Sequence, residues 1–406
     1  MNSPILQRLL LVRGLRAFAD GYVSLLLPLY LIALGMTPLQ VGIIATGTLL
    51  GSGVLTLAAG LYAYRFTYRG LLLAASLLMA GTGLGFAVLT DFWPLLVIAF
   101  VGTLNPSSGD VSVFLPLEHA VLSHLVSDRD RTALFARYSM VGTVVAAFGS
   151  LAASLPDMVV GAIPVTLKSA LQAMFGLYAA IGMLSALIYR TLPTGVGSAT
   201  HGTAAPLKDA KKAVYTLAAL FSLDSLAGGL VVQSMIALWL FQKYQLSVVF
   251  TATLFFWTGL LSAVSYLVAA RIAGRFGLLN TMVFTHLPSS VFLVLIPFTP
   301  NLGWAIALLL ARAALSQMDV PTRSSYVMAI VPPAERAAAA SVTAVPRSLA
   351  AAIGPLVAGY LLGVSSFGWP LIIAGALKII YDLLLLLTFK AVRPPEEINQ
   401  AGKRIA

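Results

Sequence analysis

The stretch LPTGVGSATHGTAAPLKDAKK, residues 192–212, is the one long polar connection in this sequence of 406 residues, and it lies close to the middle. Its content of Gly, Thr, Ala and Ser and its basic end are typical of a flexible linker. On both sides, the sequence is dominated by apolar segments of about 20 residues, the length that a membrane-spanning helix needs. The stretch therefore separates two predicted helical bundles, residues 1–191 and 213–406.

The composition excludes a soluble protein. Hydrophobic residues make up 59% of the chain and charged residues 10%, whereas a soluble domain has about 25% charged residues. The apolar runs are long and continuous, which favours helices over the short alternating strands of a transmembrane barrel. We predict an all-α polytopic membrane protein with twelve transmembrane helices, arranged as two pseudo-symmetric six-helix bundles. The expected spans are residues 9–34, 38–63, 70–90, 93–122, 133–155, 167–189, 213–241, 247–270, 278–299, 302–329, 337–363 and 368–389.

The net charge of +11 is distributed unevenly over the loops. Sixteen basic residues fall on the linker, the termini and the loops of one side, whereas the other side holds Lys168 and Lys243. Positive charge collects on the cytoplasmic side of membrane proteins, so the basicity reports orientation and contact with anionic lipid, not a nucleic-acid partner. We expect a monomer in a bacterial inner membrane with both termini cytoplasmic. The chain has no cysteine, and we expect no cofactor and no metal.

Landmarks in the two halves recur at a nearly constant offset. Asp20 and Asp224 are 204 residues apart, and Asp110 and Asp319 are 209 apart. The segments that run from Arg131 to Gly149 and from Arg336 to Gly354 each advance 18 residues. Weak internal symmetry of this kind is a mark of secondary transporters, whose substrate site lies between the repeats near the membrane midplane.

The loop after the second span reads GLYAYRFTYR, residues 60–69, and the loop after the eighth reads AGRFGLLNT, residues 273–281. With its twelve spans and mid-chain linker, the chain resembles the major facilitator superfamily, whose loop motif is G-x-x-x-D-R-x-G-R-K; Tyr64 stands here in the place of the acidic residue. The resemblance implies alternating access and a cytoplasmic gate. The basic residues expected at that gate are Arg65, Arg69, Arg131, Arg275 and Arg336.

The same resemblance implies that the first, fourth, seventh and tenth spans line a central cavity. These four spans carry Asp20, Asp110, Asp224 and Asp319. A carboxylate at the bilayer centre costs about 2.5 to 3.5 kcal/mol even on a lenient insertion scale, so such residues generally face water or a partner. We expect Asp20 and Asp224 to be the proton-coupling carboxylates, because neither has a basic neighbour one turn away on the cavity side at midplane depth.

Other intramembrane charges are expected to form a network in the cavity. Asp319 and Arg323 are four residues apart on one helix face and are predicted to neutralise each other, as are Lys378 and Asp382 on the last span. Glu118, His119 and His124 are expected near the cytoplasmic headgroups, with a metal site as a weaker alternative. The predicted cavity charges are Arg13, Arg16, Asp110, Arg312, Asp319 and Arg323.

Several polar and aromatic residues could contact an organic substrate, although ordinary packing explains each one as well. They are Tyr22, Ser24, Tyr30, Phe114, Gln233 and Trp239. The leading hypothesis is a secondary active transporter of a small organic solute, proton-coupled, with antiport and export favoured. The alternative is a carrier whose intramembrane arginines bind an anionic substrate. A membrane-embedded enzyme or receptor is disfavoured, because a catalytic site does not require pseudo-symmetric halves.

Overall fold

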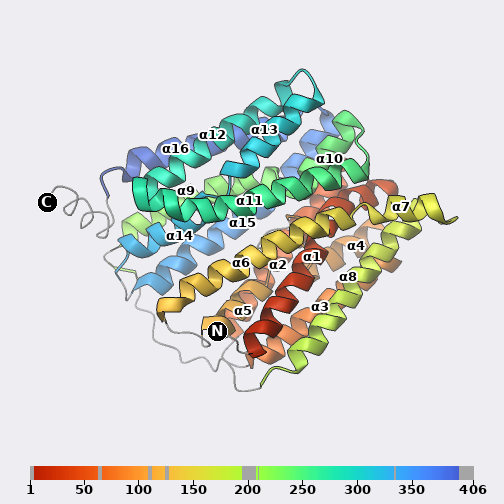
Figure 1. Cartoon of the computed structure of the whole chain (residues 1–406), viewed down its shortest axis with the longest axis horizontal. Helices are drawn as coiled ribbons and strands as arrows, with labels where there is room; N and C mark the ends of the chain where they lie inside the picture. The colour runs from red at the N-terminus through yellow and green to blue at the C-terminus, as the bar shows by residue number, and fades with distance from the viewer. Residues whose placement is uncertain are drawn as a thin grey trace. The chain divides into compact units, whose positions relative to one another are not determined.

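In the computed structural model, the described residues are 4–62, 66–107, 112–123, 128–193, 207–208, 210–332 and 335–392. Within these ranges the chain is helical and contains no strand (Figure 1). The helices are α1 (Pro4–Ala33), α2 (Pro38–Tyr62), α3 (Tyr68–Val88), α4 (Phe92–Val101), α5 (Phe114–Ser123), α6 (Asp128–Ala152), α7 (Leu155–Ala162), α8 (Leu167–Arg190), α9 (Lys211–Leu230), α10 (Gln233–Tyr244), α11 (Val248–Phe276), α12 (Leu278–Leu295), α13 (Leu302–Leu315), α14 (Asp319–Ile330), α15 (Arg336–Val364) and α16 (Trp369–Phe389), with a short 3₁₀ helix at Ile296–Phe298.

The helices make this an integral membrane protein. Ten helical segments of the described chain are long and apolar enough to cross a bilayer. The remaining two predicted spans, the fourth and the tenth, are each divided between two shorter helices, α4 with α5 and α13 with α14. The ten segments and the two divided ones together fit the expected twelve.

The breaks in the fourth and tenth spans correct the expectation of continuous helices there, and so does the break between α9 and α10 in the seventh span. After α4, Gly102 adopts an extended conformation, and the Asn105 side chain accepts hydrogen bonds from the backbone N–H and the hydroxyl of Ser107. The break between α13 and α14 is explained by Pro321, the third residue of α14. Its ring clashes with the carbonyl of Gln317 in a continuous helix and removes a hydrogen bond, so the helix restarts at Asp319.

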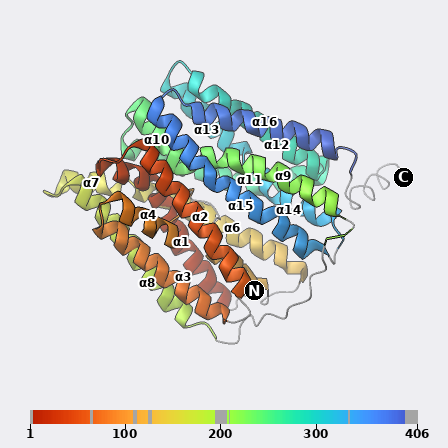
Figure 2. The same cartoon turned by 180° about the vertical axis from the view of Figure 1, so that it is seen from behind.

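Contacts divide the chain into two compact units, which do not follow the two sequence halves residue by residue. The first unit comprises Met1–Thr200, Val231–Leu260 and Pro355–Phe367, and the second comprises His201–Leu230, Leu261–Gly354 and Gly368–Ala406. In the first unit α3 and α8 lie side by side, as do α1 and α6 (Figures 1 and 2). In the second unit α12 packs along α16, and an apolar core forms where α9, α12, α14 and α16 meet. The boundaries at residues 191 and 212 stay a prediction.

Each unit contains a close helix crossing at repeat-related positions. In the first unit, a Cβ added to Gly21 of α1 would lie 3.0 Å from the Cα of Gly149 on α6. In the second, a Cβ added to Gly229 of α9 would lie 3.0 Å from the Cα of Gly354 on α15. Both contacts place backbone against backbone, which a glycine permits and a larger residue blocks. The landmark spacing in the sequence thus corresponds to a structural feature shared by the two units.

Candidate functional site

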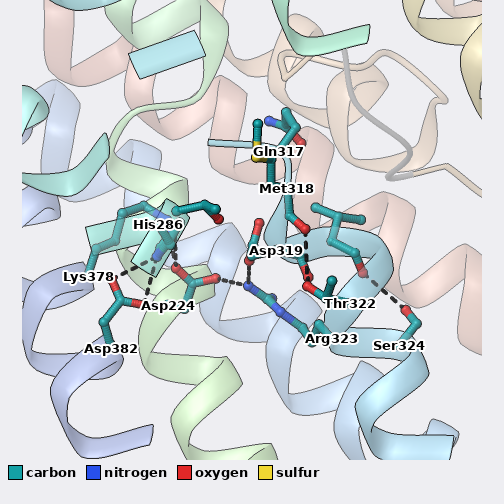
Figure 3. Close-up of polar contacts among 12 residues, drawn as sticks. Asp224, His286, Gln317, Met318, Asp319, Thr322, Arg323, Ser324, Lys378 and Asp382 are labelled. Atoms are coloured by element: carbon teal, nitrogen blue, oxygen red, sulfur yellow. Dashed lines mark hydrogen bonds and ion pairs between the residues drawn. The ribbon is translucent and has the colours of Figure 1, made fainter. Parts of the chain in front are cut away.

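Asp224, in the second half of α9, lies at the centre of a buried cluster of charged side chains (Figure 3). Lys378 of α16 donates from Nζ to Asp224 Oδ1 at 2.6 Å. Arg323 of α14 donates from Nη2 to Asp224 Oδ2 at 2.7 Å. All three side chains are buried. As expected, no basic residue lies one turn away from Asp224 on α9, and both of its cations come from two other helices.

Arg323 also binds a second carboxylate. Its Nη2 donates to Asp319 Oδ2, one turn earlier on α14, which confirms the predicted pair. The guanidinium carbon lies 5.0 Å from the centre of the Phe221 ring and 5.8 Å from that of Tyr381. Aromatic faces attract a guanidinium, so Arg323 is held from several sides while it neutralises two acids.

The predicted pairing of Lys378 with Asp382 is replaced by a different arrangement. Lys378 is bound to Asp224, and Asp382 instead contacts His286 of α12, whose Nδ1 lies 3.0 Å from each carboxylate oxygen. His286 Nε2 is 3.5 Å from Lys378 Nζ and 3.7 Å from Asp224 Oδ1. Sequence reasoning missed His286. The available signal was a titratable residue in the middle of an apolar span, a position where such a residue is costly.

The first unit contains a second buried charge cluster, built around Glu118 of α5. Arg16 of α1 donates to Glu118 Oε2, the Tyr138 hydroxyl donates to the same oxygen, and the Tyr189 hydroxyl donates to Oε1 at 2.6 Å. Glu118 is 0% exposed, so its expected place among the lipid headgroups is wrong. Burial becomes possible because three other helices supply one cation and two hydroxyl donors to this single carboxylate. The Arg16 guanidinium also lies 3.9 Å from the Phe114 ring centre.

Asp20 lies one turn beyond Arg16 on α1 and is 8% exposed. It is within electrostatic reach of Arg16, Tyr22 and Tyr178. Arg13, one turn before Arg16 on α1, places its guanidinium 4.9 Å from the Tyr138 ring centre.

The remaining predicted residues are scattered or lie outside the described chain. His119 is half-buried and stacks on Phe135, with ring centres 4.3 Å apart; its place near the headgroups stays a prediction. Arg275 and Arg336 are exposed, and Arg69 is half-buried, so the gate stays a prediction. Arg65, Asp110 and His124 and the side chain of Arg131 lie outside the described residues.

Arg312 and Arg347 are half-buried in the second unit. Within the described part of the chain, neither makes an ion pair or a hydrogen bond through its side chain.

The polar atoms of the predicted substrate residues are occupied inside the protein. Their partners favour a packing role, and substrate contact stays a prediction. The hydroxyls of Tyr22, Ser24 and Tyr30 donate to the backbone carbonyls of Met174, Gly21 and Phe86, at 3.2, 2.9 and 2.8 Å respectively. Trp239 Nε1 donates to the carbonyl of Ser366 at 3.1 Å, and Gln233 Nε2 donates to Ser150 Oγ at 3.5 Å. The ring of Phe114 packs against the Arg16 guanidinium.

Comparison with known proteins places this arrangement in a family. The model of the Major Facilitator Superfamily matches residues 9–316 and 217–405. A protein of Saccharomyces cerevisiae, described as an uncharacterized membrane protein, is 26% identical over 413 residues, which cover 93% of this chain and 92% of that protein.

Solved structures show the same fold at low sequence identity. A variant of the nucleoside transporter NupG has a TM-score of 0.77 at 14% identity, over 95% of this chain and 99% of that one. A bacterial homolog of the human lysosomal transporter Spinster has a TM-score of 0.72 at 15% identity, over 96% and 97%. The xylose transporter XylE from E. coli has a TM-score of 0.65 at 13% identity, over 94% and 95%.

Proposed function

We propose a proton-coupled mechanism for this chain, which belongs to the Major Facilitator Superfamily and is an integral membrane protein with the fold of a secondary transporter. In this mechanism a small organic solute crosses the membrane by alternating access while a proton crosses the membrane with or against it. Export by antiport is the favoured direction. The observation that carries the proposal is a buried carboxylate at repeat-related positions of α1 and α9, Asp20 and Asp224.

The carboxylates support coupling through the cost of burying their charge. A cavity that opens to one side and then to the other changes the hydration of the groups that line it. Protonation of Asp20 removes a charge that is costly in an occluded, water-free state, so the conformational change becomes linked to the proton. Asp224 is held by two cations, so we assign it a smaller share of the coupling than Asp20.

The transported solute is proposed at the level of a small organic compound. Structural neighbours are described as transporters of nucleosides, xylose and organic anions, and these three classes are suitable for a first flux screen. The anionic alternative is favoured by Arg312 and Arg347. Both are half-buried cations of the second unit, and neither has an ionic or hydrogen-bonding side-chain partner in the described chain. Loss of binding in Arg312→Gln and Arg347→Gln, for an organic anion only, would support this alternative.

The coupling proposal predicts that Asp20→Asn separates exchange from accumulation. Asn keeps the shape and hydrogen bonding of the side chain but does not ionise. In proteoliposomes with an imposed pH gradient, the variant is expected to exchange labelled solute at a rate near that of the unmodified protein. It should lose accumulation against a gradient by about tenfold or more, the range expected when one essential proton-transfer group is removed. Asp224→Asn should show the same defect to a smaller extent.

Asp157→Asn is the matched control, because Asp157 lies in the first turn of α7 and is a member of neither charge cluster. This variant should accumulate solute as the unmodified protein does. If Asp20→Asn and Asp224→Asn both retain full accumulation driven by pH, the assignment of proton coupling to these carboxylates is wrong.

A further inference from the structure

His286 and Lys378 compete for one oxygen atom. Lys378 Nζ lies 2.6 Å from Asp224 Oδ1, and His286 Nε2 lies 3.7 Å from the same oxygen. The two nitrogens are themselves 3.5 Å apart. Two cations at that separation repel each other, so Asp224 Oδ1 accommodates Lys378 together with a neutral imidazole, but not Lys378 together with an imidazolium at hydrogen-bond distance.

The other side of the imidazole fixes which nitrogen receives a proton. Nδ1 lies 3.0 Å from both oxygens of Asp382, and a carboxylate accepts hydrogen bonds but does not donate them when ionised. Nδ1 therefore carries the hydrogen of the neutral ring, and the free lone pair is on Nε2. An added proton binds there, and it turns Nε2 from an acceptor that faces Lys378 into a donor that faces Asp224.

From this geometry we infer that His286 is a proton-carrying residue of the second unit and that its protonation exchanges the partner of Asp224 Oδ1 from Lys378 to His286. One proton passes from water to Nε2, and no other covalent bond changes. The exchange replaces a tie between α9 and α16 by a tie between α9 and α12. This inference rests on the proposed proton coupling and specifies how Asp224 takes part in it without being protonated itself.

The displaced ammonium has a place to go. Asp382 lies one turn beyond Lys378 on α16, at the spacing that lets two side chains of one helix meet. The pair that the sequence predicts is thus the pair expected in the protonated state. In the contacts of the cluster, three carboxylates face two permanent cations (Figure 3), so a proton on His286 brings the directly bonded groups to neutrality.

Other charged groups set the field around the imidazole. Arg312 and Arg347 lie within electrostatic reach of Asp224, and they add positive charge without touching His286. The titratable or charged groups in contact with His286 are Asp224 from α9 and Lys378, Tyr381 and Asp382 from α16. Arg323 and Asp319 from α14 join the cluster through Asp224, and Arg312 from α13 and Arg347 from α15 lie within electrostatic reach of Asp224.

The test measures the proton on His286 directly and needs no substrate. The full chain, labelled with ¹⁵N-histidine and held in lipid nanodiscs, has four histidines, and His286→Gln assigns the ring signals of His286 by difference. We expect the Nε2 signal to titrate. In Lys378→Met its midpoint should rise by about one pH unit or more, because a neighbouring charge shifts a titration by roughly that amount. Arg347→Met removes a cation whose side chain makes no ion pair or hydrogen bond in the described chain, and it should move the midpoint by much less.

The range from about pH 5 to 9 brackets the ordinary titration of histidine. If the His286 ring keeps one protonation state over this range in both the unmodified protein and Lys378→Met, the proposed exchange of partners is overturned. Equal shifts in Lys378→Met and Arg347→Met would also overturn it, because direct competition for one oxygen would then have no measurable effect. If the ring titrates with the expected dependence on Lys378 while the proteoliposomes show no flux driven by pH, the partner exchange stands and the proposed proton coupling falls.

Discussion

Arg323 is the residue on which the buried charges of the second unit depend most. It binds Asp319 on its own helix and Asp224 on α9, whereas Asp319 has Arg323 as its one ion-pair partner in the described chain. Removing one member of a buried pair leaves an uncompensated charge and is far more harmful than replacing the whole pair by apolar groups. The two members of this pair should therefore differ in how much their loss destabilises the protein.

We predict that Arg323→Met lowers the free energy of unfolding by about 3 to 5 kcal/mol, the range for breaking a buried ion pair, because it strands Asp319 and weakens the hold on Asp224. Asp319→Asn should be milder, since Arg323 keeps Asp224. The double variant should lose less free energy of unfolding than the sum of the losses in the two single variants. Thermal unfolding in detergent measures all three. Simple additivity would count against a direct interaction between Asp319 and Arg323.

The pair of Asp319 and Arg323 could be predicted from sequence because both residues lie on one helix at a spacing of four. The ion pair of Arg16 with Glu118 joins residues 102 positions apart, and no local rule connects them. Asp224 illustrates the same limit: its own helix offers no cation within one turn, and both of its cations come from helices that follow much later in the chain. Sequence identifies the charges that need partners; the packing of helices decides which partners they find.

At the scale of the helix, the crossing of α9 with α15 rests on one glycine. A side chain at Gly229 would clash with the backbone of Ala351 and Gly354, whereas the adjacent Gly228 has open space where a Cβ would stand. The two positions share the same helix and nearly the same depth. They therefore separate the effect of close packing from the effect of helix propensity.

We predict opposite outcomes for alanine at these two glycines. Gly228→Ala should stabilise the protein by up to about 1 kcal/mol, because alanine is the better helix former. Gly229→Ala should destabilise it by about 1 to 3 kcal/mol, the usual effect of forcing extra atoms into a packed contact. Melting temperatures of the purified variants measure both changes. Equal behaviour of the two variants would show that α9 and α15 do not approach as closely as the structure has them.

Helices could be predicted more reliably than their interruptions. The apolar runs at residues 167–189 and 368–389 match α8 and α16 within one or two residues, because an uninterrupted run with turn residues at its ends has one simple solution. The tenth span contained Pro321 in its middle, and the apolar pattern on both sides concealed the break that this residue imposes. Pro321 accompanies a divided helix at α13 and α14, whereas Pro28 and Pro288 lie inside the continuous helices α1 and α12, so a proline alone does not identify the break.

At the scale of the whole chain, several contacts bring together segments that the topology assigns to one side of the membrane. Arg8, near the start of α1, donates to the carbonyl of Thr191 just after α8, at 2.8 Å. The Tyr326 hydroxyl, in the second half of α14, donates to the carbonyl of Val392 after α16, at 3.2 Å. Each pair joins ends that lie on the same side in the twelve-span topology. That topology could be predicted from sequence because hydrophobic periodicity and loop charge are properties of single segments and do not depend on which segments pack together.

The orientation predicted from loop charge can be tested in this cysteine-free chain. Helix α8 has 24 residues, which at about 1.5 Å per residue is enough to cross a hydrocarbon core of about 30 Å. Sites before and after it should therefore lie on opposite sides. We predict that single cysteines at Gly161 and Ser247 react with a membrane-impermeant maleimide added outside intact cells, and that cysteines at Ser198 and Lys212 react only after the membrane is opened. Two sites on each side guard against a single unreactive position. Labelling of Gly161→Cys and Lys212→Cys from the same side would mean that α8 does not cross the membrane. Reversed labelling of all four sites would leave the predicted spans intact but place the basic loops outside, against the rule that positively charged loops stay in the cytoplasm.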